Sequence, residues 1–382
     1  MRITVICDVL GEENNGTTIA GMNLIRSLTE KGHEVRVVCP NTFEGERRGY
    51  YKVETLSLGF LNNYLKKNGV VLAKPDDSAI RAAMDGADVV HLLLPFSLSK
   101  RAAPIAKELG IPMTAGFHFQ AENFTAHLGI LRCNAISNAI YRSRWKGVFR
   151  HVDCIHYPTK FIRDVFEGAI GRKTEGRVIS NGVNRAFSEN ALKRTGSNGK
   201  FTIICTGRYS REKRQELLIK AVSLSKHKEE IRVILAGDGP RKKWLNSLAV
   251  KEGVDVQLKF FSREELLGAL ASSDLYVHTA EIEIEAIACL EAIASGLVPV
   301  IANSPRSATR YYALDDDNLF DYKSAESLAE KIDFWFENKN KIPQNREKYR
   351  GFTKEIDYDV CMGMMERMII DTANKRKTEG EK

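Results

Sequence analysis

Short β-branched runs alternate with longer amphipathic stretches along nearly the whole of this chain, and no other feature limits the possible folds as strongly. Runs of Val, Ile and aromatic residues are typical of strands, whereas apolar residues at helical spacing are typical of packed helices. A parallel pair of strands needs a long crossover connection, usually a helix, so this alternation builds parallel sheets. The pattern therefore predicts an α/β protein with doubly wound parallel sheets.

The candidate strands fall into two series. The first series comprises Ile3–Cys7, Glu34–Cys39, Val89–Leu94, Pro112–Phe117, Cys154–Tyr157 and Arg177–Ser180. The second comprises Phe201–Cys205, Arg232–Ala236, Gln257–Phe261, Leu275–His278 and Val298–Ile301. Each series is long enough to build one Rossmann-like domain.

A polar segment separates the two series. Residues 188–200, SENALKRTGSNGK, have no apolar periodicity and are typical of a linker. We therefore expect an N-terminal domain over residues 1–187 and a C-terminal domain over residues 201–357. Residues 358–382 carry apolar side chains at helical spacing before the charged end KRKTEGEK. They predict a helix that packs back on the N-terminal domain and ends in a tail.

The composition excludes several classes of protein. The chain has 382 residues, 43% of them hydrophobic, and no apolar run near the roughly 20 residues that span a bilayer. The opening MRITVICDVL reaches Asp8 before a signal-peptide core develops, so we expect a cytoplasmic protein. The seven cysteines form no CxxC pair and are expected to be small buried hydrophobes. The net charge of +8 indicates an anionic partner: a nucleotide sugar, nucleic acid or an acidic membrane surface.

Two loops that follow strands are suited to anions. In the first, Gly16 lies in a polar loop between Ile3–Cys7 and a helix expected near Ile19, where free amides attract negative charge. The alternative is an ordinary strand-to-helix turn. The loop has no GxGxxG, which disfavours a dinucleotide-dependent dehydrogenase. In the second, Arg208 and Lys213 precede a helix and can hold phosphate oxygens, unless they form only a solvated basic helix start.

Two further motifs lie beyond the second loop. The turn around Gly237, Ala-Gly-Asp-Gly-Pro, allows close approach of a ligand but is also a common turn. Glu283 comes just before an expected helix and Glu291 lies inside it, with seven residues between them. The two carboxylates can meet different hydroxyls of one extended ligand, unless Glu283 belongs to a solvated acidic face.

These motifs together resemble the family 4 glycosyltransferases of the GT-B fold. The residues that carry the resemblance are Gly207-Arg208 with Lys213, the Gly237–Pro240 turn, Asn181-Gly182-Val183, and above all Glu283 and Glu291 followed by Ala-Ile-Ala-Ser-Gly. The segment GTTIAGMNLIRSLTEKGHEVRVVCP resembles the opening of the same family, so the likeness spans nearly the whole chain. It implies two Rossmann-like domains facing a central cleft.

The resemblance also implies roles for individual residues. Arg208 and Lys213 would hold the diphosphate of a nucleotide-sugar donor, and Glu291 would bind its ribose hydroxyls. Glu283 would face the donor sugar, together with the backbone at Ala286 and Ile287. His118 matches the histidine near the sugar's C6 hydroxyl, although the residue alone would suggest a strand-end histidine without a reactive role. Gly16 matches the glycine loop beside the reaction centre.

The chain departs from the family pattern at two places. Glu285-Ala286 stand where the family usually has Phe-Gly, and Arg214 replaces the usual glycine after the lysine. Members of the family retain anomeric configuration and use fixed cations where other glycosyltransferases use a divalent metal. We therefore expect no metal requirement. Asp315-Asp316-Asp317 contains a DxD, the metal motif of the other glycosyltransferase fold, and is expected to be a solvated turn.

A basic, aromatic-rich stretch suggests where the acceptor binds. Residues 123–152 contain no Asp and no Glu, and their cationic side chains are interspersed with apolar ones. The candidate membrane or acceptor residues are Arg132, Tyr141, Arg142, Arg144, Trp145, Lys146 and Arg150. A second patch comprises Leu58, Phe60, Leu61, Tyr64, Lys66 and Lys67. Both could lie on an anionic bilayer, or could be ordinary helices with a basic outer face.

We therefore expect a hexosyltransferase that uses UDP-glucose or UDP-galactose and glycosylates a membrane lipid such as diacylglycerol. It would be peripheral on the inner face of the cell membrane. The alternative acceptor is a lipid-linked or soluble saccharide in cell-surface polysaccharide assembly. A nucleic-acid-binding protein is a remote alternative, because the cations match no known reader motif.

Overall fold

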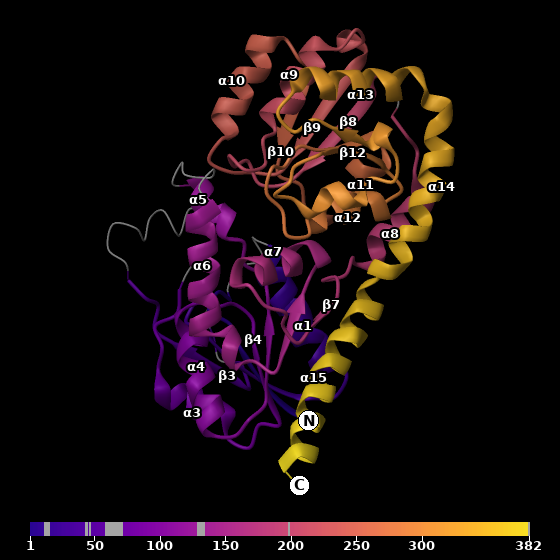
Figure 1. Ribbon diagram of the computed structural model, residues 1–382. Helices are drawn as coiled ribbons and strands as arrows, with labels where there is room; N and C mark the ends of the chain where they lie inside the picture. Colours follow the sequence, from indigo (N-terminus) through magenta and orange to yellow (C-terminus); the bar gives the residue numbers. More distant parts are fainter. Residues whose placement is uncertain are drawn as a thin grey trace. The chain divides into compact units, whose positions relative to one another are not determined.

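The computed structural model describes the chain except for residues 11–15, 43–44, 46, 58–71, 128–133, 198 and 381–382 (Figure 1). The chain divides into two compact units. The first comprises Met1–Ala121, Arg132–Asn181 and Cys361–Lys382, and the second Glu122–Leu131 and Gly182–Val360. Each unit is an α/β domain built on one parallel sheet, as predicted.

The first unit contains a seven-stranded sheet in the order β3-β2-β1-β4-β5-β6-β7. Its strands are β1 (Arg2–Ile6), β2 (Glu34–Pro40), β3 (Tyr50–Val53), β4 (Val89–Leu92), β5 (Met113–Gly116), β6 (Cys154–Tyr157) and β7 (Gly176–Val178). All neighbouring strands of this sheet run parallel. β4 and β5 are buried over their full length, as is typical of a parallel sheet covered on both faces.

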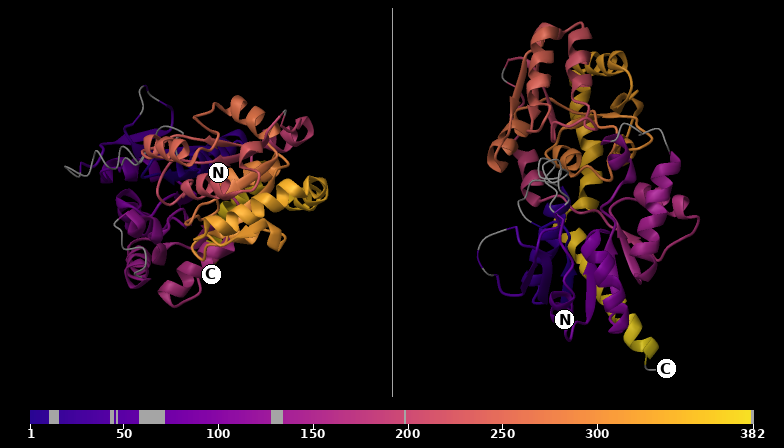
Figure 2. Two further views of the ribbon diagram at one scale, coloured as in Figure 1. Left: turned by 90° about the horizontal axis from the view of Figure 1, so that it is seen from above. Right: turned by 90° about the vertical axis from the view of Figure 1, so that its left-hand side faces the viewer.

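The helices of the first unit are α1 (Gly16–Glu30), α3 (Asp77–Met84), α4 (Ser97–Glu108), α6 (Asn134–Gly147), α7 (Lys160–Ile170) and, from Cys361 on, α15 (Tyr358–Gly380). All of α5 (Ala121–His127) except its first residue belongs to the second unit. α15 carries the chain back to the first unit and runs along it, as Figure 1 and the right-hand view of Figure 2 show. Glu366 on α15 accepts hydrogen bonds from Lys31 at 2.6 Å and His33 at 2.9 Å. Arg177 on β7 pairs with Asp371 at 2.7 Å.

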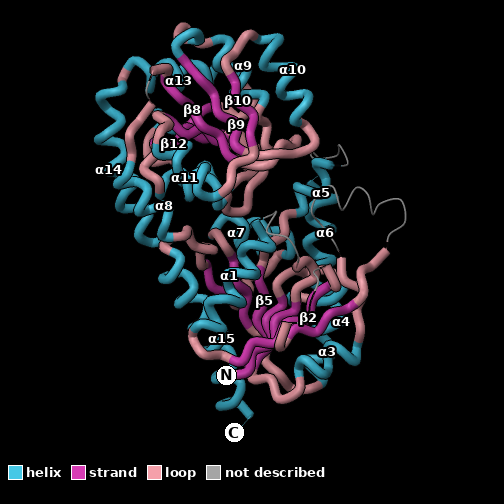
Figure 3. Tube along the Cα trace, turned by 180° about the vertical axis from the view of Figure 1, so that it is seen from behind, coloured by secondary structure: helices cyan, strands magenta, loops and turns pink. Residues whose placement is uncertain are grey.

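The second unit contains a six-stranded sheet in the order β10-β9-β8-β11-β12-β13. Its strands are β8 (Phe201–Thr206), β9 (Ile231–Ala236), β10 (Val256–Lys259), β11 (Leu275–His278), β12 (Val298–Ala302) and β13 (Leu319–Phe320). Counted along the chain, this is the order 3-2-1-4-5-6 of a Rossmann-like sheet, and the first unit begins with the same order. Figure 3 shows both sheets surrounded by helices.

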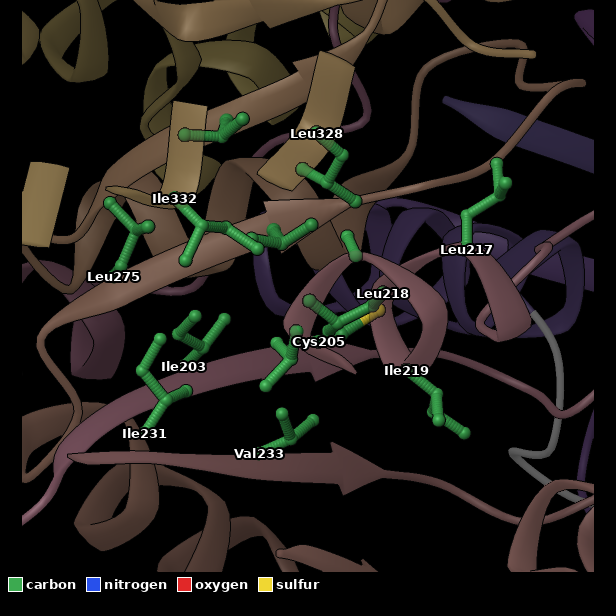
Figure 4. Packing of buried hydrophobic residues seen from close by; sticks show 14 of the residues in the cluster. Ile203, Cys205, Leu217, Leu218, Ile219, Ile231, Val233, Leu275, Leu328 and Ile332 are labelled. Atoms are coloured by element: carbon green, nitrogen blue, oxygen red, sulfur yellow. The ribbon is translucent and has the colours of Figure 1, made fainter. Parts of the chain in front are cut away.

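The helices of the second unit are α8 (Arg185–Asn190), α9 (Glu216–Leu224), α10 (Lys242–Glu252), α11 (Arg263–Ala271), α12 (Ile287–Ala294), α13 (Ala325–Glu337) and α14 (Ile342–Phe352). They bury both faces of the sheet. Ile203 and Cys205 of β8 pack against α9 and α13, as Figure 4 shows, whereas Ile204 between them belongs to the core on the opposite face. The six cysteines that the structure describes are buried and free, and Cys133 lies outside the described residues.

Two strands were not predicted. β3 and β13 are edge strands with four and two residues, too short and too polar in their surroundings for an apolar pattern. Their pairing with β2 and β12 decides their conformation. The other strands lie where they were predicted, with ends that agree or differ by at most two residues.

The prediction of a linker over residues 188–200 was wrong. The division between the units falls at 181/182, and this segment packs within the second unit. Asn190 donates to the carbonyl of Leu267 at 2.9 Å, and Arg194 donates to that of Leu270 at 3.0 Å. Polar side chains of this segment instead cap the end of α11. Composition alone cannot distinguish a solvated linker from a polar segment that caps a helix.

Candidate active site

The candidate donor site lies at the carboxyl ends of β8 and β11, two neighbouring strands of the second sheet. In an open α/β sheet, ligands bind at the point where the strand order reverses, and β8 and β11 form that point here. Gly207 and Arg208 follow β8 directly, and Glu283 follows β11 after four residues. The structure therefore brings the motifs from both loops to one edge of one sheet.

The glycines around this edge allow two loops to pack closely. A Cβ atom on Gly237 would lie 2.1 Å from the carbonyl oxygen of Gly207, which leaves no space for any side chain. The amide of Tyr209 donates to the carbonyl of Asp238 at 2.8 Å. The sequence predicted that Gly237 lets a ligand approach, but what approaches it here is the Gly207 backbone.

Lys213 and Glu283 form the central ion pair of the site. His278, the last residue of β11, places its Nε2 3.2 Å from the same carboxylate oxygen, Oε1. Burial raises the pKa of Glu283, but the charge of Lys213 and the hydrogen bond with His278 outweigh it and hold the pKa at about 2. Glu283 is therefore a buried carboxylate that is ionised at neutral pH.

A chain of hydrogen bonds orients the His278 ring. Its Nδ1 lies 3.0 Å from the hydroxyl of Tyr276, which lies 3.0 Å from the hydroxyl of Thr206. Sequence reasoning missed Tyr276 and His278. Strand alternation places both side chains on the same side of β11, but it does not show which neighbours they meet.

Arg208 and Arg214 have different surroundings. Arg208 is partly exposed and its Nη2 lies 3.5 Å from Glu212. Arg214 has a left-handed backbone, with φ of 51°, and donates to the carbonyl of Tyr322 at 2.9 Å and to Glu281 at 3.4 Å. The guanidinium of Arg214 thus links the loop before α9 to the loop after β11. The residue that replaces the family's usual glycine therefore has a structural role.

The N-terminus of α12 faces the same sheet edge. Its N-cap residue, Ala286, has φ of 62° and makes no side-chain capping bond. A left-handed backbone suits glycine and costs an alanine about 1 kcal/mol. Cys289 and Leu290 donate to the carbonyl of Ala286, so Ile287 and Ala288 lie in the turn whose amides have no intrahelical acceptor. Such uncapped amides form an anion site.

Glu291 is a carboxylate without a counterion. It lies within α12, and among the described residues no hydrogen bond or ion pair reaches its side chain. Burial raises its pKa to about 7, and the distant charge of Arg263 lowers it only in part. A partly buried carboxylate to which the described residues give no partner is suited to accept hydrogen bonds from a ligand.

The first unit carries a group of three histidines, of which His91 and His156 are buried and His118 is partly buried. His118 follows β5, and its ring centroid lies 5.4 Å from that of His156 on β6. Burial, with contributions from His156 and His91, holds the pKa of His118 well below its usual value. The pKa values of His91 and His156 fall, mainly through burial, to about 3 and about 4. The His118 imidazole is therefore neutral at physiological pH and can exchange hydrogen bonds with a hydroxyl.

The loop after β1 is only partly described. Gly16 is the first residue of α1, so the helix starts three residues before its predicted beginning, and residues 11–15 lie outside the described part. Asp8, which sequence reasoning did not single out, caps α4 by accepting from the amides of Leu98 at 2.6 Å and Ser99 at 3.2 Å. Burial raises its pKa to about 6.

The basic helix α6 corrects part of the predicted acceptor patch. Tyr141 is fully buried and its hydroxyl accepts from the amide of Ala121 at 3.1 Å, so it belongs to the core. Trp145 is partly buried beside Phe166, and Arg144 donates to the carbonyl of Pro95 at 3.4 Å. Their burial follows from the apolar core of the first unit, which takes the aromatic side of the helix.

Three cations of the patch remain exposed: Arg142, Lys146 and Arg150. Arg142 also donates to the carbonyl of Ala169 at 2.9 Å. Arg132 and the second predicted patch, at residues 58–67, lie outside the described residues. None of the described helices is long and apolar enough to cross a bilayer.

The DxD of the sequence lies apart from the candidate site. Asp315 accepts from Lys348 at 2.8 Å and Asp317 lies 3.5 Å from Lys331, so both carboxylates have lysine partners. Within the part of the chain that the structure describes, no group of three or more His, Cys, Asp or Glu side chains is arranged to hold a metal ion.

Comparison with known proteins identifies relatives over most of the chain. Residues 15–187 match the family model Glycosyltransferase Family 4, and residues 187–354 match Glycosyl transferases group 1. The alpha-monoglucosyldiacylglycerol synthase of Streptococcus pneumoniae is 24% identical over 320 residues, which cover 79% of this chain and 71% of the synthase.

Two solved structures are also similar. The catalytic domain of cholesterol-alpha-glucosyltransferase from Helicobacter pylori is 50% identical, covers 40% of this chain and 96% of that domain, and has a TM-score of 0.39. The Anabaena protein HepE, in complex with UDP and glucose, is 15% identical with a TM-score of 0.71 over 97% of this chain and 99% of its own. With two matching family models and two parallel-sheet α/β units, the chain belongs to the family 4 glycosyltransferases of the GT-B fold.

Proposed function

We propose that this glycosyltransferase moves a hexose from UDP-glucose or UDP-galactose to the hydroxyl group of a membrane lipid, such as diacylglycerol. The transfer retains the anomeric configuration and needs no metal. The observation that carries the donor half of the proposal is the unpartnered Glu291 inside α12, a helix whose N-terminus is uncapped. A nucleotide sugar offers ribose hydroxyls to the carboxylate and phosphates to the amides.

The cations of the second unit suit the departing diphosphate. When the bond between the anomeric carbon and the diphosphate oxygen breaks, the electron pair leaves with the diphosphate and the sugar gains oxocarbenium character. Arg208 and Lys213 are proposed to bind that charge. The acceptor oxygen forms the new bond on the same face of the sugar, and its proton passes to a phosphate oxygen of the donor.

Glu283 has a positioning role in this scheme. Its carboxylate is held between Lys213 and His278, which favours orientation of a sugar hydroxyl over attack on the anomeric carbon. His118, being neutral, is proposed to bind the C6 hydroxyl of the donor sugar. The family resemblance supports both assignments, and the complex of HepE with UDP and glucose supports the donor class.

The acceptor half of the proposal rests on α6 and on the relatives. Arg142 and Lys146 on α6 and Arg150 in the short turn just after it are exposed cations of the first unit, and such clusters favour anionic bilayers. The relative from Streptococcus pneumoniae is named for a glycolipid product. We therefore place the protein on the cytoplasmic face of the cell membrane as a peripheral enzyme.

Product analysis tests the acceptor and the donor together. The purified protein is mixed with UDP-sugars or GDP-sugars and with anionic vesicles that contain diacylglycerol or cholesterol, and the products are identified by mass spectrometry. We expect a glycolipid only with a UDP-hexose and lipid vesicles, and equal yields with and without a metal chelator. Transfer to soluble or lipid-linked saccharides alone would replace the acceptor by the polysaccharide alternative.

Charge reversal tests the membrane surface. We expect the triple change of Arg142, Lys146 and Arg150 to Glu to abolish cosedimentation with anionic vesicles while it spares UDP binding. A matched triple reversal on α10, of Lys242, Lys243 and Lys251, should leave cosedimentation unchanged. Equal vesicle binding by both variants would remove α6 from the membrane surface.

A further inference from the structure

A second cationic cavity lies at the opposite edge of the second sheet from the donor site. It has a volume of about 300 Å³ and is lined in part by Arg194, Phe201, Asp274, Lys339 and Arg346. Phe201 begins β8 and Asp274 directly precedes β11, whereas the donor motifs follow the other ends of these two strands. Since β8 has six residues, the two sites are separated by roughly 20 Å of strand.

The two arginines of the cavity have unsatisfied donors. The Nε atoms of Arg194 and Arg346 are buried, and neither has a hydrogen-bond partner in the described part of the chain. Arg194 uses its other nitrogens to bind the carbonyls of Leu270, at 3.0 Å, and Ser273, which leaves Nε unused. Orphaned buried donors are uncommon in folded proteins because each costs free energy.

Both arginine stems rest on a single glycine. A Cβ atom on Gly296, which ends α12, would lie 3.1 Å from Cδ of Arg194 and 3.6 Å from Cδ of Arg346. The absence of a side chain there lets the two stems lie together. The guanidiniums are consequently close enough for burial and the charge of Arg346 to lower the pKa of Arg194 to about 10.

The cavity carries more positive than negative charge. Arg194, Arg346 and Lys339 contribute three cations against the single carboxylate of Asp274. That carboxylate is already engaged, since it accepts from the amides of Thr202 at 2.8 Å and Ser197 at 3.2 Å. Like charges brought together in a partly buried place are unfavourable unless an anion joins them.

We propose that this cavity is a binding site for a small phosphate-bearing anion, separate from the donor site. Guanidinium groups match the geometry of phosphate oxygens, and Lys339 adds a point charge at the rim. The volume equals that of roughly ten water molecules, enough for a phosphate with a small organic group. The proposal does not depend on the identity of the sugar or the acceptor.

Calorimetric titration tests the site with two probes, inorganic phosphate and glucose 6-phosphate, in phosphate-free buffer and saturating UDP. UDP occupies the donor site, so any remaining phosphate binding must be elsewhere. We expect both Arg346→Gln and Lys339→Gln to weaken the binding at least 10-fold. Lys341→Gln is the matched control, because this lysine also lies near an aromatic ring, at 4.8 Å from Phe334, but does not line the cavity.

The outcomes separate the possible sources and the possible failures. Tighter binding of glucose 6-phosphate would identify a phosphorylated metabolite, and equal or tighter binding of phosphate would identify the free ion; both support the site. Unchanged UDP affinity in the variants shows that the second unit is folded. The proposal is overturned if wild type binds neither probe, if the cavity variants bind as wild type does, or if Arg208→Gln abolishes phosphate binding.

Discussion

The two units share one strand order but differ in the ionisable groups that their sheets carry toward the ligand-binding edge. β4, β5 and β6 of the first unit bring together His91, His118 and His156, which burial keeps neutral. The corresponding edge of the second unit carries the Lys213–Glu283 ion pair. Hydrogen bonds and counterions keep Lys213 and Glu283 charged, whereas burial keeps the three histidines neutral.

The difference teaches that topology fixes where a site lies and side-chain environment fixes what it can bind. Both sheets place their loops at a switch point, where an open α/β sheet binds ligands. Charged groups in the second unit suit a polyanionic donor. Neutral imidazoles in the first unit suit uncharged hydroxyl groups, which exchange hydrogen bonds without a change in net charge.

Removal of the central cation is expected to have the largest effect. Lys213→Ala should lower the hexose transfer rate by roughly 100- to 1000-fold, because the cation stabilises charge that develops as the diphosphate leaves. It also leaves Glu283 buried beside His278 alone, so the pKa of Glu283 should rise. Steady-state kinetics measure the rate. Lys220→Ala, on the exposed side of α9, is the control, and equal activity of the two variants would contradict the assignment.

Acidification should affect the two units in opposite directions. His91 and His156 have pKa values of about 3 and about 4 in the folded state against 6.5 when unfolded, so the unfolded chain binds protons first as pH falls. Their contribution is complete above pH 6.5 and is progressively lost toward pH 4. At pH 5.5 the two histidines together lower the free energy of unfolding by about 3 kcal/mol relative to neutral pH. Asp8, whose pKa is raised to about 6 in the folded state, offsets about 1 kcal/mol of this loss.

Glu291 reverses this sign in the second unit. Its folded pKa of about 7 means that the folded state holds the proton between about pH 4.5 and 7, so acidification through that window stabilises it. Hydrogen exchange followed by mass spectrometry at pH 7.5 and 5.5 separates the units. Protection of β4–β6, corrected for intrinsic exchange, should fall at pH 5.5, while that of β11 and α12 should not. A parallel loss in both units would be inconsistent with the comparison.

Loss of the unpartnered carboxylate should reduce affinity without reducing stability. Glu291→Ala is expected to weaken nucleotide-sugar binding about 10-fold, the effect of losing hydrogen bonds to a charged group. Because the carboxylate is partly buried without a counterion, the melting temperature of the variant at pH 8 should equal or exceed that of wild type. Calorimetry and thermal melts measure the two quantities. Unchanged affinity, or lower affinity with a collapsed melting temperature, would count against a ribose-binding role.

The smallest effect is expected at the strained N-cap of α12. Ala286→Gly should stabilise the second unit by about 0.5 kcal/mol, since glycine relieves the left-handed backbone but gains entropy when unfolded. Ala288→Gly in the first turn should instead destabilise it by up to about 1 kcal/mol. Urea titrations measure both. Equal destabilisation by the two glycines would show that Ala286 bears no strain in solution.

Much of the site could be predicted because its residues lie in short loops next to strong strands. Arg208, Lys213 and Glu283 follow β8 and β11, whose apolar runs are unambiguous in the sequence. The residues that orient them could not be found in this way. Tyr276 orients His278 on β11, and His278 contacts Glu283 in the loop that follows. The pattern within one strand does not reveal which neighbours its side chains meet.

The acceptor patch shows the same limit. Arg142, Tyr141 and Arg144 are neighbours in the sequence, yet one is exposed, one is in the core and one is partly buried against Pro95. The basic composition correctly suggested an amphipathic helix. Which side of that helix meets the core depended on Phe117 and Phe166, which come from other elements.

The sequence by itself determined the alternation of strands and helices, the two parallel sheets and the loops that carry charge, because hydrophobic periodicity and glycine conformations are local properties. Only the tertiary structure decided three features: the charge states of the three histidines, the lack of a partner for Glu291 among the described residues, and the packing of residues 188–200 within the second unit. These depend on burial and on partners distant in the chain. A side chain's dielectric surroundings and counterions exist only after the elements have packed.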